Sequence, residues 1–268
     1  MSRKLFWRPD SRGLTRPTIR DLVFAALVIV PLAAIYVAGL GIYQHYTAKD
    51  LRFVQARQLR FDEAIDVQAR KKAFFDFMRP IVVAENQRIT QLRRRLVAAR
   101  KAGRRPAWVA ATAKDYGVDW TGGEWEALLQ RVDIVPLPLA LAQSANESNW
   151  GQSRFAQQGN NMFGQWCFRK GCGMVPKQRK SGQNHAVASY DTVNASVRAY
   201  MKNINTGAAY KDLRQLRRRA RRNGEEPNAM LLAAGLARYS ERGAAYVNDI
   251  RAMIGKNRAL MADAGAGR

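Results

Sequence analysis

One glutamate near the middle of this 268-residue sequence lies where its side chain is expected to be shielded from water. Glu147 follows a stretch of small and apolar residues that ends at Ala145, and it precedes Trp150 and Gly151. Burial disfavours the charged form of a carboxyl group and so raises its pKa. A carboxyl that keeps its proton at neutral pH can act as a general acid towards a glycosidic oxygen. A lone glutamate at a helix end is more often a solvated charge, so both interpretations stay open at this point.

The two cysteines, Cys167 and Cys172, are separated by four residues. In an oxidising compartment such a pair is expected to form a disulfide, and closing so small a loop stabilises the fold by about 2 kcal/mol on the chain-entropy model. A metal site is less favoured, because there is no second cysteine pair and the only histidines are His45 and His185. We expect neither a metal nor a cofactor.

Helices are predicted to position these residues. Apolar residues recur at three- and four-residue spacing within 44–105, where Pro80 is expected to start or kink a helix. Further helices are predicted at 108–116, 123–130 and 136–150. Between 164 and 190 glycine and proline interrupt this pattern, and two short strands are predicted, starting at Gly173 and Ala186. The expected fold class is mainly α, with a small β-hairpin lobe inserted in a helical domain.

A helix is predicted to resume after this lobe, with Asp191 and Thr192 as its caps. Its expected buried stripe comprises Val193, Val197, Tyr200, Met201 and Ile204. Two basic runs are prominent. The run from Arg93 to Arg105 is most simply a solvated helix end and loop, and the run from Arg214 to Arg222 should end at Asn223-Gly224.

The segment 22–43 contains no charged residue and is long enough, at about 33 Å as a helix, to cross a bilayer. Six basic residues and two acidic residues precede it, which predicts a cytoplasmic N-terminus and a periplasmic domain on one inner-membrane span. A cleaved signal peptide is the rival, disfavoured by the length of the apolar run. A buried soluble helix is disfavoured because it would be apolar all round.

The formal net charge of +24 is compatible with nucleic-acid binding. The predicted topology argues against that function, because an exported domain meets no chromosome. A basic surface outside the membrane would instead attract anionic lipid or the carboxylates of a cell wall.

The stretch AQSANESNWGQSRFAQQGNNMFG resembles the signature of glycoside hydrolase family 73, in which a glutamate is followed by S-x-W-G-x-S and then by N-N-x-F-G. The continuation QWCFRKGCGMVP, and KKAFFDFMRPIVVAENQRI upstream, resemble a narrower bacterial branch, the Bax-like proteins. The similarity covers about residues 70 to 255. It implies a lysozyme-like helical domain with a cleft beside a β-lobe, and cleavage of peptidoglycan at N-acetylglucosamine.

The predicted anchor and this resemblance together give an organisation for the whole chain. It comprises a cytoplasmic basic tail at 1–21, a transmembrane anchor at 22–43, a helical stem at 44–105 packing on the domain, a glucosaminidase domain at 106–258 with its β-lobe at about 164–190, and a tail at 259–268. Peptidoglycan is the expected substrate and the inner membrane the expected location. Any regulatory protein partner is left unidentified.

The resemblance also assigns roles to individual residues. Glu147 takes the place of the family's catalytic glutamate, and Tyr239 matches a tyrosine that lies in the cleft beside it. The residues expected to bind substrate are Trp150, Asn161, Phe163, Gln165, Tyr190 and Tyr246. The alternatives are structural: core packing for Trp150 and Phe163, a self-bonded loop for Asn161, a half-buried phenol for Tyr239 and a helix cap for Asp191.

One departure from the family pattern affects the mechanism. Many members carry a second carboxylate on the β-lobe, but this chain has no Asp or Glu between Gly164 and Tyr190. A two-carboxylate inverting mechanism therefore lacks its expected base. Assistance by the substrate's 2-acetamido group, oriented by Tyr239, is one replacement, and His185 is a weaker candidate base. Lytic transglycosylase chemistry with a single glutamate and a non-catalytic wall-binding scaffold remain as alternative functions.

Overall fold

The computed structural model describes residues 54–262 except 60, 62–64, 178, 180, 181, 183 and 240. These residues belong to a compact unit that spans 50–268. Within the described part of the chain, no helix combines the length and apolarity needed to cross a bilayer. The predicted span at 22–43 lies outside the described residues.

The longest helix, α2 (Val67–Lys101), begins where the carboxylate of Asp66 accepts hydrogen bonds from the first backbone amides. The expectation that a helix starts at Pro80 is wrong, because α2 runs through this residue. Proline removes the hydrogen bond to the carbonyl of Asp76, but burial of the adjoining face keeps the segment helical. The buried apolar side chains of α2 are Phe74, Phe75, Met78, Ile81, Val82, Ile89, Leu96 and Ala99.

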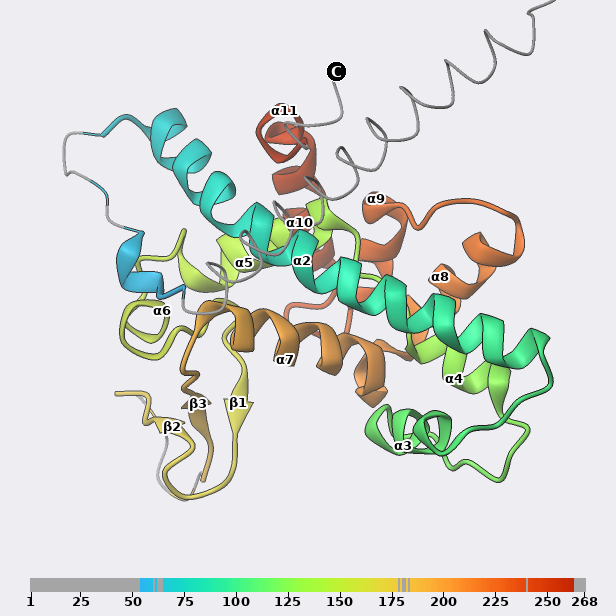
Figure 1. The fold of residues 1–268 in the computed structure, drawn as a ribbon. Coiled ribbons are helices and arrows are strands. Elements are labelled where there is room, and N and C mark those ends of the chain that lie inside the picture. Colours follow the sequence, from blue (N-terminus) through green and yellow to red (C-terminus); the bar gives the residue numbers. More distant parts are fainter. Residues whose placement is uncertain are drawn as a thin grey trace, which may run out of the picture. The chain divides into compact units, whose positions relative to one another are not determined.

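Helix α5 (Leu137–Ser148) packs against α2 and α10 (Figure 1). The other helices are α3 (Ala107–Asp115), α4 (Trp125–Arg131), α6 (Arg154–Gly159), α7 (Val193–Thr206), α8 (Lys211–Arg222), α9 (Ala229–Leu232), α10 (Ala244–Lys256) and α11 (Arg258–Met261). Short 3-10 turns occupy Ala56–Gln58, Ala208–Tyr210 and Ala233–Leu236. The helices predicted at 108–116, 123–130 and 136–150 end within two residues of α3, α4 and α5.

The helix after the lobe, α7, packs along α2 and buries the predicted stripe from Val193 to Ile204. Its N-cap is Thr192, whose hydroxyl accepts from the amide of Ala195. Asp191 does not cap the helix; its backbone carbonyl accepts a hydrogen bond from the side chain of Gln55. Farther on, α8 ends at Arg222, as the Asn223-Gly224 pair predicts, with Gly224 in the left-handed region at φ +73°.

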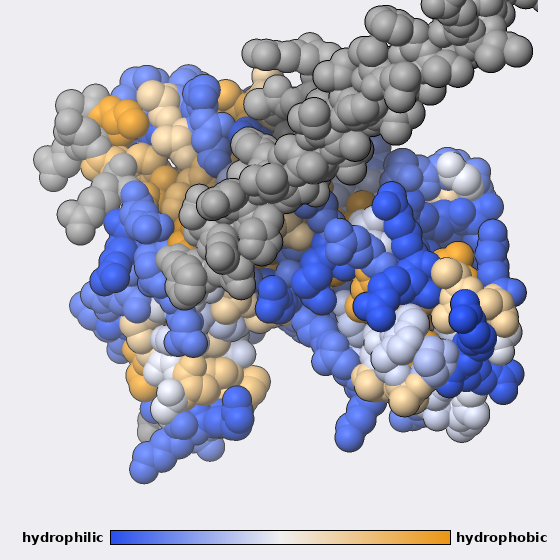
Figure 2. Space-filling model, viewed as in Figure 1, coloured by the Kyte–Doolittle hydropathy of each residue, from blue (hydrophilic) through white to orange (hydrophobic). Residues whose placement is uncertain are grey.

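The β-lobe is a three-stranded antiparallel sheet in the order β1-β3-β2, not a two-stranded hairpin. It comprises β1 (Trp166–Cys167), β2 (Gly173–Met174) and β3 (Ala186–Ala188). The central strand β3 pairs with both neighbours. A disulfide joins Cys167 and Cys172, with 6.1 Å between their Cα atoms, and so links the end of β1 to the start of β2. Apolar residues appear on the surface of this lobe (Figure 2).

Candidate active site

The carboxyl group of Glu147 lies in the last turn of α5, at the edge of a cleft of about 710 Å³. The residues that line this cleft are Asn146, Glu147, Phe163, Gly164, Gln165, Trp166, Asn203, Tyr210, Tyr239, Glu241, Arg242 and Tyr246. They come from α5, the loop into the β-lobe, β1, α7, the 3-10 turn that follows α7, the segment that leads into α10, and α10 itself. Within the described residues, no group of three or more His, Cys, Asp or Glu side chains is arranged to hold a metal ion.

A tight turn places Glu147. After α5 the backbone enters the left-handed region at Asn149, Trp150 and Gly151 in succession. A side chain at Gly151 would also collide with Leu59, since a Cβ atom there would lie 2.7 Å from its Cδ2 atom. The turn sends the chain away from the cleft directly after the glutamate.

The environment of Glu147 favours the protonated carboxyl. Burial raises its pKa above the ordinary value. Two hydrogen bonds oppose this shift without cancelling it: the hydroxyl of Tyr246 donates to Oε1 at 2.9 Å, and the amide of Asn146 donates to the same oxygen at 3.1 Å. The group is therefore held in its acid form to a higher pH than an exposed glutamate.

The hydroxyl of Tyr246 belongs to a buried chain of hydrogen bonds behind Glu147. Tyr246 accepts from Nε2 of Gln143 at 3.0 Å, and Oε1 of Gln143 accepts from the hydroxyl of Tyr200 at 2.6 Å. Because each amide and hydroxyl has its partner, the donor that faces Glu147 is fixed in direction. Tyr246, placed among the expected substrate-binding residues, is 2% exposed and contacts the glutamate itself.

Tyr239 lines the cleft, with its ring stacked on that of Tyr246 at a centroid distance of 5.1 Å. Its hydroxyl donates to the backbone carbonyl of Phe163 at 2.8 Å. Burial raises the pKa of Tyr239, and the nearby carboxyl of Glu147 raises it further. The phenol is therefore neutral and is bonded to the backbone.

The loop from Asn160 to Gln165 is held by its own amides. The side chain of Asn161 is 1% exposed and donates to the carbonyls of Gln165 and Ala188, at 2.9 and 2.8 Å. Its carbonyl oxygen accepts from the amide of Gln165 at 3.1 Å. Phe163 stacks on Tyr200 at a centroid distance of 3.8 Å and also forms part of the cleft wall. Asn161 therefore supports the loop from beneath the cleft, and Phe163 contributes directly to the cleft wall.

The remaining predicted residues divide between the cleft and the core. Gln165 lines the cleft and accepts from the hydroxyl of Tyr190 at 3.0 Å. Burial raises the pKa of Tyr190 to about 12, so this phenol is neutral. Trp150 is not among the cleft residues; its ring packs edge-to-face on Phe74 and Phe75.

Seven of the residues that line the cleft were not predicted from the sequence, and two of them, Trp166 and Glu241, bear on its chemistry. The indole of Trp166 is 60% exposed and stacks on His185 at 4.1 Å, which makes it an aromatic platform of the kind that binds sugar rings. Glu241 adds a second carboxylate to the lining. The sequence signal for Trp166 was its place directly after Gly164-Gln165. Glu241 had no such signal, since it lies 94 positions after Glu147.

The family described as mannosyl-glycoprotein endo-beta-N-acetylglucosaminidase matches residues 123–259, a range that contains Glu147 and every residue lining the cleft. Protein bax of Escherichia coli (strain K12) is 34% identical over 201 residues, which is 72% of this chain and 72% of that protein. No solved structure matches the chain.

Proposed function

The chain belongs to this glucosaminidase family and is a glycoside hydrolase that acts on peptidoglycan, and on that premise we propose that it is a membrane-anchored endo-β-N-acetylglucosaminidase with Glu147 as general acid. One observation carries the assignment of the acid: a half-buried carboxyl with a raised pKa lies at the edge of a cleft that has an aromatic wall. The identity with Protein bax supports a place in the Bax-like branch.

In the proposed reaction the proton of Glu147 passes to the glycosidic oxygen as the bond from that oxygen to the anomeric carbon breaks. The donors from Tyr246 and Asn146 stabilise the carboxylate that this transfer leaves behind. The carbonyl oxygen of the substrate's own 2-acetamido group bonds to the anomeric carbon. Water then opens this intermediate and gives up a proton to Glu147, which restores the acid.

The acetamido group is invoked because the β-lobe carries no carboxylate of its own. In this mechanism Tyr239 orients that group, and its hydroxyl would exchange its bond to Phe163 for one to the sugar. Tyr239→Phe should then lower kcat. Full activity of this variant on peptidoglycan would remove the role.

Glu241 provides the test between assistance by the substrate and activation of water by a second carboxylate. If the acetamido group does this work, Glu241→Gln keeps the reaction rate within about tenfold of wild type. A loss of about 10²-fold or more, restored by azide with inversion at the anomeric carbon, would instead assign the base to Glu241.

The anchor and the periplasmic location are supported by the sequence of 22–43 and by the basic residues that precede it. Two reporters can be fused to the C-terminus, a periplasmic form that is active only in the periplasm and a cytoplasmic form that is active only in the cytoplasm. We expect activity from the periplasmic form alone. Activity of the cytoplasmic form would reverse the proposed topology.

The deciding experiment is product analysis of intact sacculi digested by the full chain. The proposal requires reducing N-acetylglucosamine ends and a loss of about 10²–10⁴-fold in rate for Glu147→Gln. 1,6-Anhydro-muramic ends would instead show a lytic transglycosylase, which needs a single acid and no base for water. Equal clearing by the wild type and Glu147→Gln would remove Glu147 from the mechanism, and no clearing by either protein would leave a wall-binding scaffold.

A further inference from the structure

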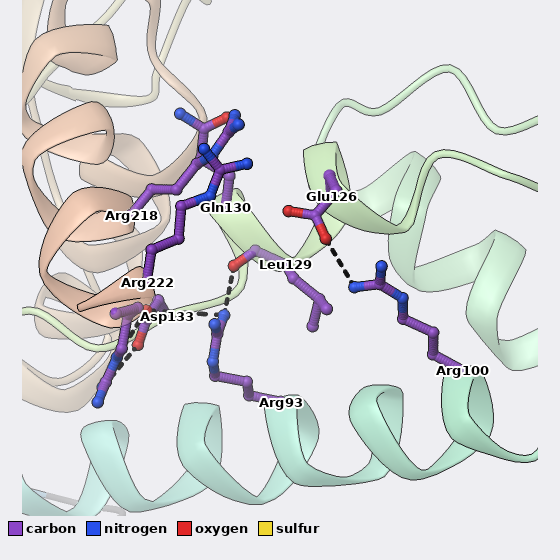
Figure 3. A pocket seen from close by; sticks show the side chains of 9 residues that line it. Arg93, Arg100, Glu126, Leu129, Gln130, Asp133, Arg218 and Arg222 are labelled. Carbon is purple, nitrogen blue, oxygen red and sulfur yellow. Dashed lines mark hydrogen bonds and ion pairs between the residues drawn. The ribbon is translucent and has the colours of Figure 1, made fainter. Parts of the chain in front are cut away.

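A second cavity, of about 190 Å³, lies between the C-terminal half of α2, α4 and α8 (Figure 3). It is lined by Arg93, Arg100, Glu126, Leu129, Gln130, Asp133, Arg218, Arg221 and Arg222. Five of these are arginines and two are carboxylates, a formal excess of three positive charges. Such a concave cluster of guanidinium groups is a site for an anion.

Some of these arginines already have structural partners. Asp133 is 2% exposed, and Arg93, Arg217 and Arg221 place guanidinium nitrogens 3.6, 3.9 and 3.1 Å from its carboxylate. Arg93 also donates to the carbonyls of Leu129 and Val132. These groups hold α2, the α4–α5 connection and α8 together, so they are fixed and not free to take a ligand.

A third lining arginine, Arg100, is paired with Glu126 at 2.7 Å, so two of the five remain available. Arg218 and Arg222 lie one turn apart on α8 and reach into the same space towards α4, while Arg93 and Arg100 rise from α2 (Figure 3). Within the described residues, neither Arg218 nor Arg222 has a hydrogen-bond or ion-pair partner. Each guanidinium therefore presents its full set of donors to whatever enters the cavity.

A neighbouring cavity of about 550 Å³ extends the cluster along α2. It shares Arg93, Asp133 and Arg221 with the first. It adds two cations, Arg94 and Lys101, and three apolar side chains, Val97, Ala98 and Ile134, together with Thr90 and the carboxylate of Glu226. The combined surface therefore places positive charge beside apolar side chains, and it would fit a short chain that carries both carboxylates and methyl groups.

This surface is separate from the catalytic cleft. The two share no lining residue. The first follows Asp133 and Ile134, just before α5 begins at Leu137, and the cleft lies at the other end of α5, at Glu147. Ten residues of helix separate Leu137 from Glu147, which is about 15 Å along the axis.

We propose that the α2–α4–α8 cavities bind the carboxylates of peptidoglycan stem peptides, and so hold the cross-linked wall while a glycan strand occupies the cleft. This inference rests on the proposed function. Stem peptides contain alanine, an acidic residue and a diamino acid, so they supply both the carboxylates and the methyl groups that the surface can take. Arg218 and Arg222 are the ligand-binding residues, and each can engage a carboxylate through two parallel hydrogen bonds.

The test is retention of the full chain, in neutral detergent, on two materials. One is intact sacculi and the other is glycan strands that an amidase has freed of their peptides and that are coupled to beads; both are used with Glu147→Gln proteins, which do not digest them. Arg218→Gln/Arg222→Gln should be retained at least about fivefold less than its parent on intact sacculi, and equally on the coupled strands. Lys211→Gln/Arg219→Gln is the control, because it removes the same charge from exposed positions of the same helix outside both cavities.

Two competitors identify the source of the anion. Stem peptides released by the amidase should displace the parent protein from intact sacculi, and glycerol phosphate at equal concentration should not. Displacement by glycerol phosphate alone would assign the cavities to lipid phosphate and overturn the proposal. Equal losses in the two double variants would overturn it as well, since net charge and not the cavity would then explain retention.

The catalytic assignment is tested separately. With Glu147 intact, Arg218→Gln/Arg222→Gln should cleave peptide-free glycan strands at the wild-type rate. If no form of the protein cleaves these strands, the proposed function fails, whereas the peptide-dependent retention on sacculi is unaffected. If strands are cleaved and retention does not depend on peptides, only the second site fails.

Discussion

The hydroxyl of Tyr246 opposes the effect of burial on the pKa of Glu147. It donates to the carboxyl and so stabilises the charged form, which lowers the pKa that burial raises. Tyr246→Phe removes this donor, and the pKa of Glu147 should rise further. We expect the alkaline limb of the kcat/KM profile to move to higher pH. Loss of the hydrogen bond from Gln143 should also cost about 1 kcal/mol of stability.

Tyr210→Phe is the matched control, because this cleft phenol is bonded to Asn203 and not to Glu147. Its alkaline limb should stay in place. If Tyr246→Phe leaves the limb unmoved as well, Glu147 is not the group whose protonation limits the rate.

The acid that serves catalysis should also weaken the fold. The pKa of Glu147 is raised in the folded protein, so its contribution to stability is full at low pH and is lost as pH rises through the folded-state pKa. Glu147→Gln cannot ionise and still accepts from Tyr246. At pH 8 it should be the more stable protein, by up to about 1 kcal/mol, and the two should converge in acid. Urea titrations at both pH values measure this, and a variant less stable at pH 8 would contradict it.

The environment of Glu147 was predictable because it is local: the apolar stretch before it and the turn after it are contiguous with it. The partner hydroxyl was not, since Tyr246 lies 99 positions away and only the packing of α10 on α5 brings the two together. The same holds for Asn161, whose type fits either a sugar contact or a self-bonded loop. Four hydrogen bonds within its own neighbourhood now account for its polar atoms.

Between elements, close packing of α8 against the turn at Ala233–Leu236 depends on Gly235. A Cβ atom at this position would lie 2.3 Å from the backbone of Leu213. Gly235→Ala should therefore destabilise the protein by about 1–3 kcal/mol, because the backbone must move. Gly255→Ala is the control: it lies exposed in α10 with open space around it, and replacing a helical glycine should stabilise by about 0.5–1 kcal/mol. Thermal unfolding should shift in opposite directions, and a neutral Gly235→Ala would show that the approach is not tight.

The elements that were predicted well carry their signal within a single segment. Apolar spacing and caps place α3, α4 and α5 to within two residues. Strand β1 was missed because its pairing with β3 lies about twenty positions ahead. Pro80 misled for a related reason: proline disfavours a helix interior locally, and the burial of Phe75 and Met78 that outweighs it is visible only in the packed structure.

At the scale of the whole molecule, the carboxylate of Asp133 links α2 and α8 within a strongly basic protein. The chain carries +24 formal charges, and mutual repulsion among them opposes compaction. The first basic run was expected to be solvated, which is wrong for Arg93, since its guanidinium turns inward to Asp133. Buried cations are tolerated there because the carboxylate and several backbone carbonyls surround them.

Burial alone would raise the pKa of Asp133, but the guanidinium groups of Arg217, Arg221 and Arg93 outweigh it and hold the pKa below its usual value. A depressed pKa contributes stability that is present above the unfolded-state value, about 3.9, and is lost as pH falls through the folded-state value. Asp133→Asn leaves buried arginines without their counter-charge, so it should cost about 3–5 kcal/mol at pH 7. Because the variant already lacks the carboxylate, the cost should shrink as pH falls below 4.

Denaturant unfolding at pH 7 and pH 3 measures both effects. Asp115→Asn is the control, because it removes an exposed partner of Lys202 and should cost less than about 1 kcal/mol at either pH. Equal small losses in the two variants would mean that the arginines at α2 and α8 are satisfied without Asp133. The α2–α4–α8 cavities would then lose their rigid support, because Arg218 and Arg222 lie on α8, the helix that Asp133 links to α2.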